Sequence, residues 1–156
     1  MKQNEHQGIA FDKLILEKVT FETDPNYTFG KKPLGVQFGV DIEKSLSEDK
    51  KRLKIVLHVH IDLSGVDPSP MKIFIVVAGH FSLRDEQNVG ALEEFAEIQA
   101  PTIIFPFVRE IIANLTMRTD FPPLLIPPVN MRVILGKKKE SIGQVKKIPR
   151  KKTPKK

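Results

Sequence analysis

The chain has 156 residues, of which 40% are hydrophobic and 28% are charged, and its formal net charge is +6. This length suits one domain with one core and excludes a large multidomain enzyme. The absence of cysteine excludes disulfides, thiolate nucleophiles and cysteine-based zinc sites. No apolar run approaches the roughly 18 residues that span a bilayer, and residues 1–8 lack the apolar stretch of a signal peptide. We therefore expect a cytoplasmic protein.

The positive charge is concentrated at the end of the chain. Residues 137–156 hold ten lysines and arginines against one glutamate, whereas residues 1–136 hold 15 basic and 18 acidic residues. The two parts therefore carry charges of +9 and −3. We expect residues 1–136 to form the domain and residues 137–156 to be a disordered basic tail, because like charges repel and the tail has few apolar residues. Such a tail suits contacts with RNA, ribosomes or another anionic surface, or serves only to keep the protein soluble.

Four strands are expected in the first half of the chain. Residues 9–22 alternate in hydropathy but change phase midway, as a bulge or bend would produce. Residues 36–42 and 53–63 alternate with a period of two, and residues 71–83 are rich in Ile, Val and Phe. The turn residues 64–70 predict an antiparallel hairpin between the last two strands. Apolar side chains on both faces of the fourth strand indicate that each face is covered.

Helices are expected to follow these strands. Residues 85–99 have helical spacing with an acidic first turn, and Pro101 ends or kinks this helix. A second helix is expected over residues 102–118, where Pro106 is tolerable only within the first turn. The four prolines of residues 121–129 predict an extended, stiff loop. Strands followed by helices favour an α+β fold, a four-stranded antiparallel sheet covered on one side by helices.

Residues with catalytic or metal-binding chemistry are sparse. His58 and His60 share a strand face, which leaves a two-histidine metal site open. A hairpin centred near Asp67 places His80 about four residues, or roughly 14 Å, from His58, so a third histidine ligand is not expected. Neither a nucleophile elbow nor a glycine-rich phosphate loop is present. We expect no catalytic residue, no metal and no cofactor, and an enzyme that uses His80 is the alternative.

The apolar residues of the second helix and the proline-rich loop are the more informative group. They either pack in the core and in an oligomer interface, or line a groove for apolar segments of another chain. The group consists of Phe105, Phe107, Phe121, Leu124, Leu125 and Ile126.

One stretch resembles a known family. This stretch is Ala100-Pro-Thr-Ile-Ile-Phe-Pro-Phe-Val-Arg-Glu110, and it continues with Arg118, Phe121-Pro122 and Pro128-Val129-Asn130. It resembles the SecB family of export chaperones. Weaker similarity covers residues 17–22 and 79–83. The resemblance implies an ATP-independent holdase that serves protein export. It also implies that protomers pair into a dimer and then a tetramer, and that unfolded polypeptides bind in apolar grooves between the sheet and the crossover loop.

The resemblance also indicates which residues contact clients. By position these are Phe74, Val76, Phe105, Phe107, Phe121, Leu124, Leu125 and Ile126. Two departures indicate a divergent branch. Lys18 stands where the family has an acidic residue that docks the motor SecA, which counts against SecA docking, and residues 131–135 with the basic tail replace a long C-terminal helix. The alternatives are a dedicated chaperone of one partner, such as an antitoxin, and an RNA- or ribosome-binding module that uses the tail.

Overall fold

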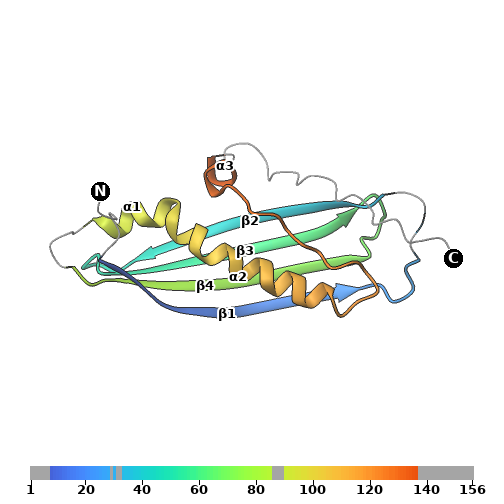
Figure 1. The fold of residues 1–156 in the computed structure, drawn as a ribbon, viewed down its shortest axis with the longest axis horizontal. Helices are drawn as coiled ribbons and strands as arrows, with labels where there is room; N and C mark the ends of the chain where they lie inside the picture. The colour runs from blue at the N-terminus through green and yellow to red at the C-terminus, as the bar shows by residue number, and fades with distance from the viewer. Residues whose placement is uncertain (1–7, 29, 31–32, 86–89, 137–156) are drawn as a thin grey trace.

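The computed structural model of the protein describes residues 8–28, 30, 33–85 and 90–136, so the predicted basic tail lies outside the described residues. The elements, in chain order, are β1 (Ile9–Thr23), β2 (Gly35–Leu46), β3 (Arg52–Ser64), β4 (Met71–Leu83), α1 (Ala91–Glu97), α2 (Gln99–Thr116) and α3 (Met131–Gly136). The four strands form one antiparallel sheet in the order β1-β4-β3-β2. Helices α1 and α2 lie on one face of this sheet (Figure 1). The predicted α+β fold is confirmed.

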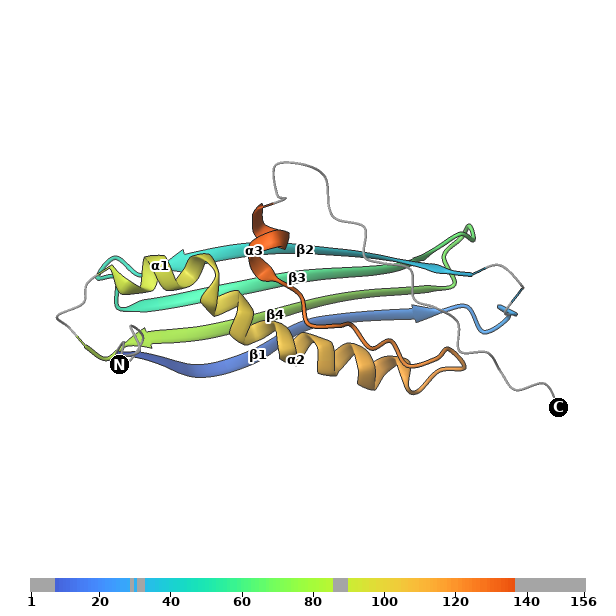
Figure 2. The same ribbon diagram turned by 45° about the horizontal axis from the view of Figure 1, so that its top comes forward.

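The alternation in the strands determines which side chains face the helices. In β3, Ile55, Leu57 and Val59 are fully buried on the helix-covered face. The alternating residues Val56 and His58 point to the opposite face. No described helix or loop covers that face (Figure 2). We call these two faces the helix face and the open face. Lys54 lies opposite His80 in the β3–β4 pairing, the register that the turn residues predict.

Strand β1 contains the bulge that its hydropathy predicts, between residues 16 and 18, and a second bulge that was not predicted. Its pairing with β4 shifts register between residues 11 and 13 and again between residues 16 and 18. The residues at the two shifts are acids, and each acid is tied across the open face. Asp12 accepts a hydrogen bond of 2.9 Å from the Ser82 hydroxyl, and Glu17 lies 3.0 Å from the Lys54 ammonium. Each bulge takes up one inserted residue, so apolar side chains of β1 on both sides of it point to the helix face.

Helix α2 packs directly on the middle of the sheet. Ile104, Val108 and Ile112 are fully buried, as their helical spacing predicts. A Cβ atom on Gly79 of β4 would lie 2.5 Å from the Cδ1 atom of Ile104. The glycine therefore allows the helix to approach the strand more closely than a side chain would permit.

The helix boundaries differ from the sequence prediction. Helix α1 begins at Ala91 and not at Asp85, because Gly90 has a φ of 105°, a left-handed conformation that precedes the first helical turn. The break predicted near Pro101 is present, because α1 ends at Glu97 and Ile98, with a φ of −134°, separates it from α2. Pro101 itself is the third residue of α2, where its missing N–H has no intrahelical partner to lose.

The prediction for Pro106 is also wrong, because this residue lies inside α2 and not in its first turn. A proline in a helix interior removes one backbone hydrogen bond. Here the ring is on the exposed side of the helix, while the adjacent Phe105 is buried against the sheet. Packing of the buried stripe therefore sustains the helix through a residue that would disrupt it in isolation.

Residues 121–130, which we call the crossover loop, carry neither helix nor strand, as the prolines predict. The loop runs back between α2 and β2 and leads into the short helix α3 (Figures 1 and 2). It therefore lies on the helix face, where it extends the layer formed by α1 and α2.

Candidate polypeptide-binding surface

Two hydrogen bonds from α2 hold the crossover loop in place. The Thr116 hydroxyl accepts the backbone N–H of Leu124 at 2.8 Å, and the Arg109 Nε–H donates to the carbonyl of Ile126 at 2.7 Å. Leu124 and Ile126 are each 5% exposed, whereas Leu125 between them is 72% exposed. The loop therefore presents one leucine to solvent from a fixed backbone. Sequence reasoning missed Arg109 and Thr116, whose partners are distant along the chain.

Two further predicted residues of this group belong to the core. The ring of Phe105 packs edge-on against Phe38 of β2, with ring centroids 5.8 Å apart. Phe121 stacks on Tyr27 at 5.9 Å, which ties the start of the crossover loop to the segment after β1. Both phenylalanines are less than one-tenth exposed. They support the surface from below and do not form it.

A second set of exposed apolar side chains lies between α2 and the edge strand β1. Phe107 is 39% exposed, and its ring centroid lies 6.1 Å from that of Phe11. Leu16 and Val19 of β1 pair with buried β4 residues on the same helix face and are also exposed. We call this set, Phe11, Leu16, Val19 and Phe107, the β1–α2 surface. Of this set, only Phe107 was predicted from the sequence, because nothing in the alternation of β1 shows that it becomes an edge strand.

An open hollow of about 460 Å³ lies where α2 begins and the crossover loop ends. Ile103 of α2, which is 39% exposed, and Val129 of the loop contribute apolar walls to it. Apolar surface is thus accessible at three places around α2.

Phe74 and Val76 lie on the open face of the sheet, away from the other six predicted residues. Val76 is 6% exposed and packs with Val56. The Lys18 ammonium lies 5.3 Å from the centre of the Phe74 ring, and the His60 ring lies 4.5 Å from the same ring. The structure therefore divides the eight predicted residues between the two faces of the sheet.

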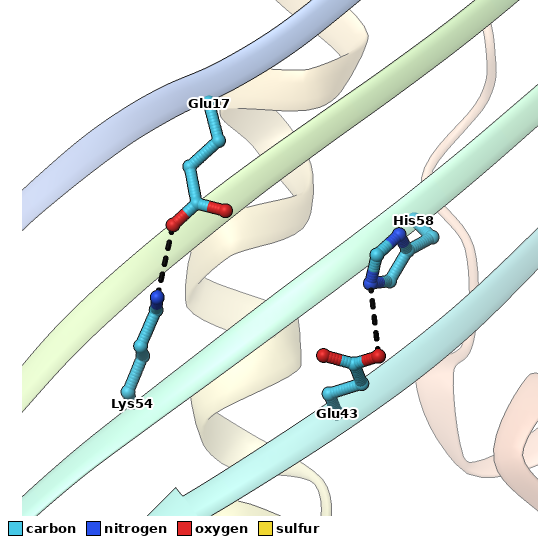
Figure 3. Close-up of polar contacts among 4 residues, drawn as sticks. All are labelled: Glu17, Glu43, Lys54 and His58. Atoms are coloured by element: carbon cyan, nitrogen blue, oxygen red, sulfur yellow. Dashed lines mark ion pairs between the residues drawn. The ribbon is translucent and has the colours of Figure 1, made fainter.

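Charged groups surround this small apolar cluster on the open face. Figure 3 shows the pair of Glu17 with Lys54, 3.0 Å apart, and the pair of His58 with Glu43, 3.4 Å apart. The described residues include no group of three or more histidines or carboxylates that could hold a metal ion. The His58–His60 pair thus has no third ligand among these residues.

His80 lies on the same open face. Burial, followed by the positive charges of Lys13 and Lys54, lowers the pKa of His80 from its ordinary value of 6.5. Both causes favour the neutral imidazole in the folded protein.

Comparison with known proteins identifies the family. The family model described as "Preprotein translocase subunit SecB" matches residues 2–141. The chain belongs to the SecB family. The resemblance found at residues 100–130 therefore predicted the family correctly. None of the described helices is long and apolar enough to cross a membrane.

The SecB relatives are similar over most of their length. The protein-export protein SecB of Nitrosococcus oceani is 26% identical over 148 residues, which cover 89% of this chain and 86% of the relative. That of Hydrogenovibrio crunogenus is 27% identical, over 92% of this chain and 99% of the relative. The uncharacterized protein MJ0357 of Methanocaldococcus jannaschii is 29% identical over 98 residues, and this chain spans only 63% of that relative's length.

A solved structure shares the fold. It is the Mycobacterium tuberculosis Rv1957 SecB-like chaperone in complex with a ChAD peptide from the Rv1956 HigA1 antitoxin. The TM-score is 0.63 at 13% sequence identity, over 78% of this chain and 91% of that chain. At this identity the comparison establishes the arrangement of sheet and helices.

Proposed function

We propose that this protein is an ATP-independent holdase chaperone, which binds unfolded or non-native polypeptides on the apolar surface around α2. The single observation that carries the proposal is Leu125, which is 72% exposed although both of its neighbours are buried. A stiff loop thus holds a leucine in solvent beside other exposed apolar side chains, an arrangement typical of sites that bind apolar segments. Binding by burial of apolar area depends little on the order of the client's residues.

The eight predicted residues take different roles in this proposal. Phe107 and Leu125 contact clients directly because both are exposed. The buried residues Phe105, Phe121, Leu124 and Ile126 shape the surface from beneath. Phe74 and Val76 would serve a separate contact on the open face. Exposed apolar residues at separate places around α2 allow one client to bind at several points, which raises its overall affinity.

The names of the similar proteins support polypeptide clients. The relatives named protein-export protein SecB favour export as the process, and the SecB-like chaperone bound to an antitoxin peptide favours a dedicated client as the alternative. In this proposal the protein is a binding protein and not an enzyme, acts in the cytoplasm and assembles into a dimer or tetramer. Lys18, beside Phe74 on the open face, counts against docking to SecA through acidic residues at that position.

The test is suppression of aggregation. A chemically denatured client is diluted into buffer without ATP, with equimolar or less chaperone, and light scattering is followed. The full chain and a version that ends at Gly136 are compared. We expect both to suppress aggregation. Suppression by neither would overturn the proposal and favour a dedicated partner or RNA. Suppression by the full chain alone, lost at high salt, would show that the basic tail and not the α2 surface holds the client.

A further inference from the structure

We infer that Arg109 and Thr116 are positioning residues of this surface, which together determine which leucine of the crossover loop faces solvent. The inference rests on the proposed function for its consequence, but its geometry does not depend on that function. Both residues lie on α2, and neither needs to contact a client. They act through the backbone of Leu124 and Ile126.

Thr116 anchors the crossover loop at Leu124. It is fully buried, and among the described residues it is the one buried residue with a polar side chain. Its hydroxyl accepts the N–H of Leu124 and lies 2.9 Å from the carbonyl of Ile112, to which it donates. A hydroxyl has one donor and two acceptor positions, so it can satisfy both groups at once. Loss of this hydroxyl leaves a buried N–H without a partner, which is costly.

The prolines of the loop make such an anchor necessary. In residues 122–128 the sequence is Pro-Pro-Leu-Leu-Ile-Pro-Pro, so only the three central residues have a backbone N–H. A segment with so few donors cannot be held by regular strand pairing. Side chains of α2 take over this role.

The second anchor fixes the register. Arg109 binds the carbonyl of Ile126, two residues after Leu124. In extended backbone, residues i and i+2 point to the same side, so anchoring these two positions turns Leu125 outward. A slip of one residue would bury Leu125 and expose both Leu124 and Ile126. A charged donor makes this bond stronger than one between neutral groups.

Thiol labelling tests the register directly. Because the chain has no cysteine, Leu124→Cys and Leu125→Cys each introduce a unique probe. In the otherwise unchanged protein we expect rapid labelling at position 125 and slow labelling at position 124. Thr116→Val and Arg109→Met should each raise the labelling rate at position 124 roughly tenfold, the factor that corresponds to loss of one buried hydrogen bond. Thr116→Ser and Arg109→Lys, which retain a hydroxyl or a donor, should restore slow labelling.

Two matched variants control for general damage to α2. The Thr102 hydroxyl bonds to the Ile98 carbonyl at 2.6 Å, and the Arg118 Nη1 bonds to the Asn114 carbonyl at 2.6 Å, so these bonds stay within the α2 segment and do not hold residues 124–126. Thr102→Val and Arg118→Met should leave labelling at position 124 slow. If Thr116→Val does not fold, as judged by circular dichroism, the partly exposed Arg109→Met variant carries the test.

Client retention in the same variants separates this inference from the proposed function. We expect Thr116→Val and Arg109→Met to lose retention in parallel with the change in labelling. If both variants label at position 124 as slowly as the unchanged protein, the positioning role is wrong, whatever happens to clients. If labelling changes as expected but the unchanged protein retains no client, the proposed function fails while the positioning role stands.

Discussion

Substitution of Leu125 by aspartate should weaken client binding without unfolding the protein. The side chain is 72% exposed in the free protein, and a bound client would cover this part. Complete burial of a leucine side chain contributes about 1.5–3 kcal/mol, so covering the exposed part contributes about 1–2 kcal/mol. Leu125→Asp should therefore raise the dissociation constant of a denatured client roughly 5–30-fold. The free energy of unfolding should change by less than about 0.5 kcal/mol, because the leucine makes few contacts in the fold.

The assay is fluorescence anisotropy of a labelled, permanently unfolded client titrated with chaperone, together with urea denaturation of each variant. Val66→Asp is the matched control, since Val66 is 38% exposed in the connection between β3 and β4 and is not part of α2 or the crossover loop. It introduces the same charge and should bind clients as the unchanged protein does. The reasoning is refuted if Leu125→Asp binds within twofold of the unchanged protein, or if Val66→Asp weakens binding as much.

Two further predictions concern the sheet. Gly79→Ala would place its Cβ 2.5 Å from the Cδ1 of Ile104, so we expect α2 to be displaced and the free energy of unfolding in urea to fall by about 1–3 kcal/mol; an unchanged midpoint would contradict this packing. Burial and the charges of Lys13 and Lys54 lower the pKa of His80. His80 therefore binds a proton less readily in the folded protein than in the unfolded chain. The free energy of unfolding should fall as the pH decreases through the unfolded pKa of about 6.5. His80→Asn removes this contribution, and its free energy of unfolding should decline less between about pH 7 and pH 5; an equal or steeper decline would contradict the shift.

Much of the sheet could be predicted because its signals are local. A period of two in β3 and turn residues after it specified both the buried side chains and the pairing of Lys54 with His80. The change of phase in β1 marked the bulge between residues 16 and 18, because an inserted residue reverses which side chains face the core. The bulge between residues 11 and 13 was not predicted. The prediction for α2 was less accurate. Pro106 lies in the interior of this helix and is tolerated there only because the helix packs against the sheet.

The candidate surface was predicted as a region but not residue by residue. Phe105 and Phe107 are two positions apart on one helix, yet one packs against Phe38 and the other is exposed beside Phe11. Phe74 was grouped with them by resemblance, although its strand places it on the open face. Whether these side chains contact clients stays a prediction.

By itself, the sequence determined the order of the four strands and of α1 and α2, the apolar face of β3 and the absence of regular structure in the crossover loop, because these depend on neighbouring residues. It did not predict the short helix α3. Its motif also identified the SecB family. Only the tertiary structure decided which of three consecutive aliphatic residues, 124–126, faces solvent. That choice depends on hydrogen bonds from Thr116 and Arg109, whose positions relative to the loop are set by the packing of α2 on the sheet.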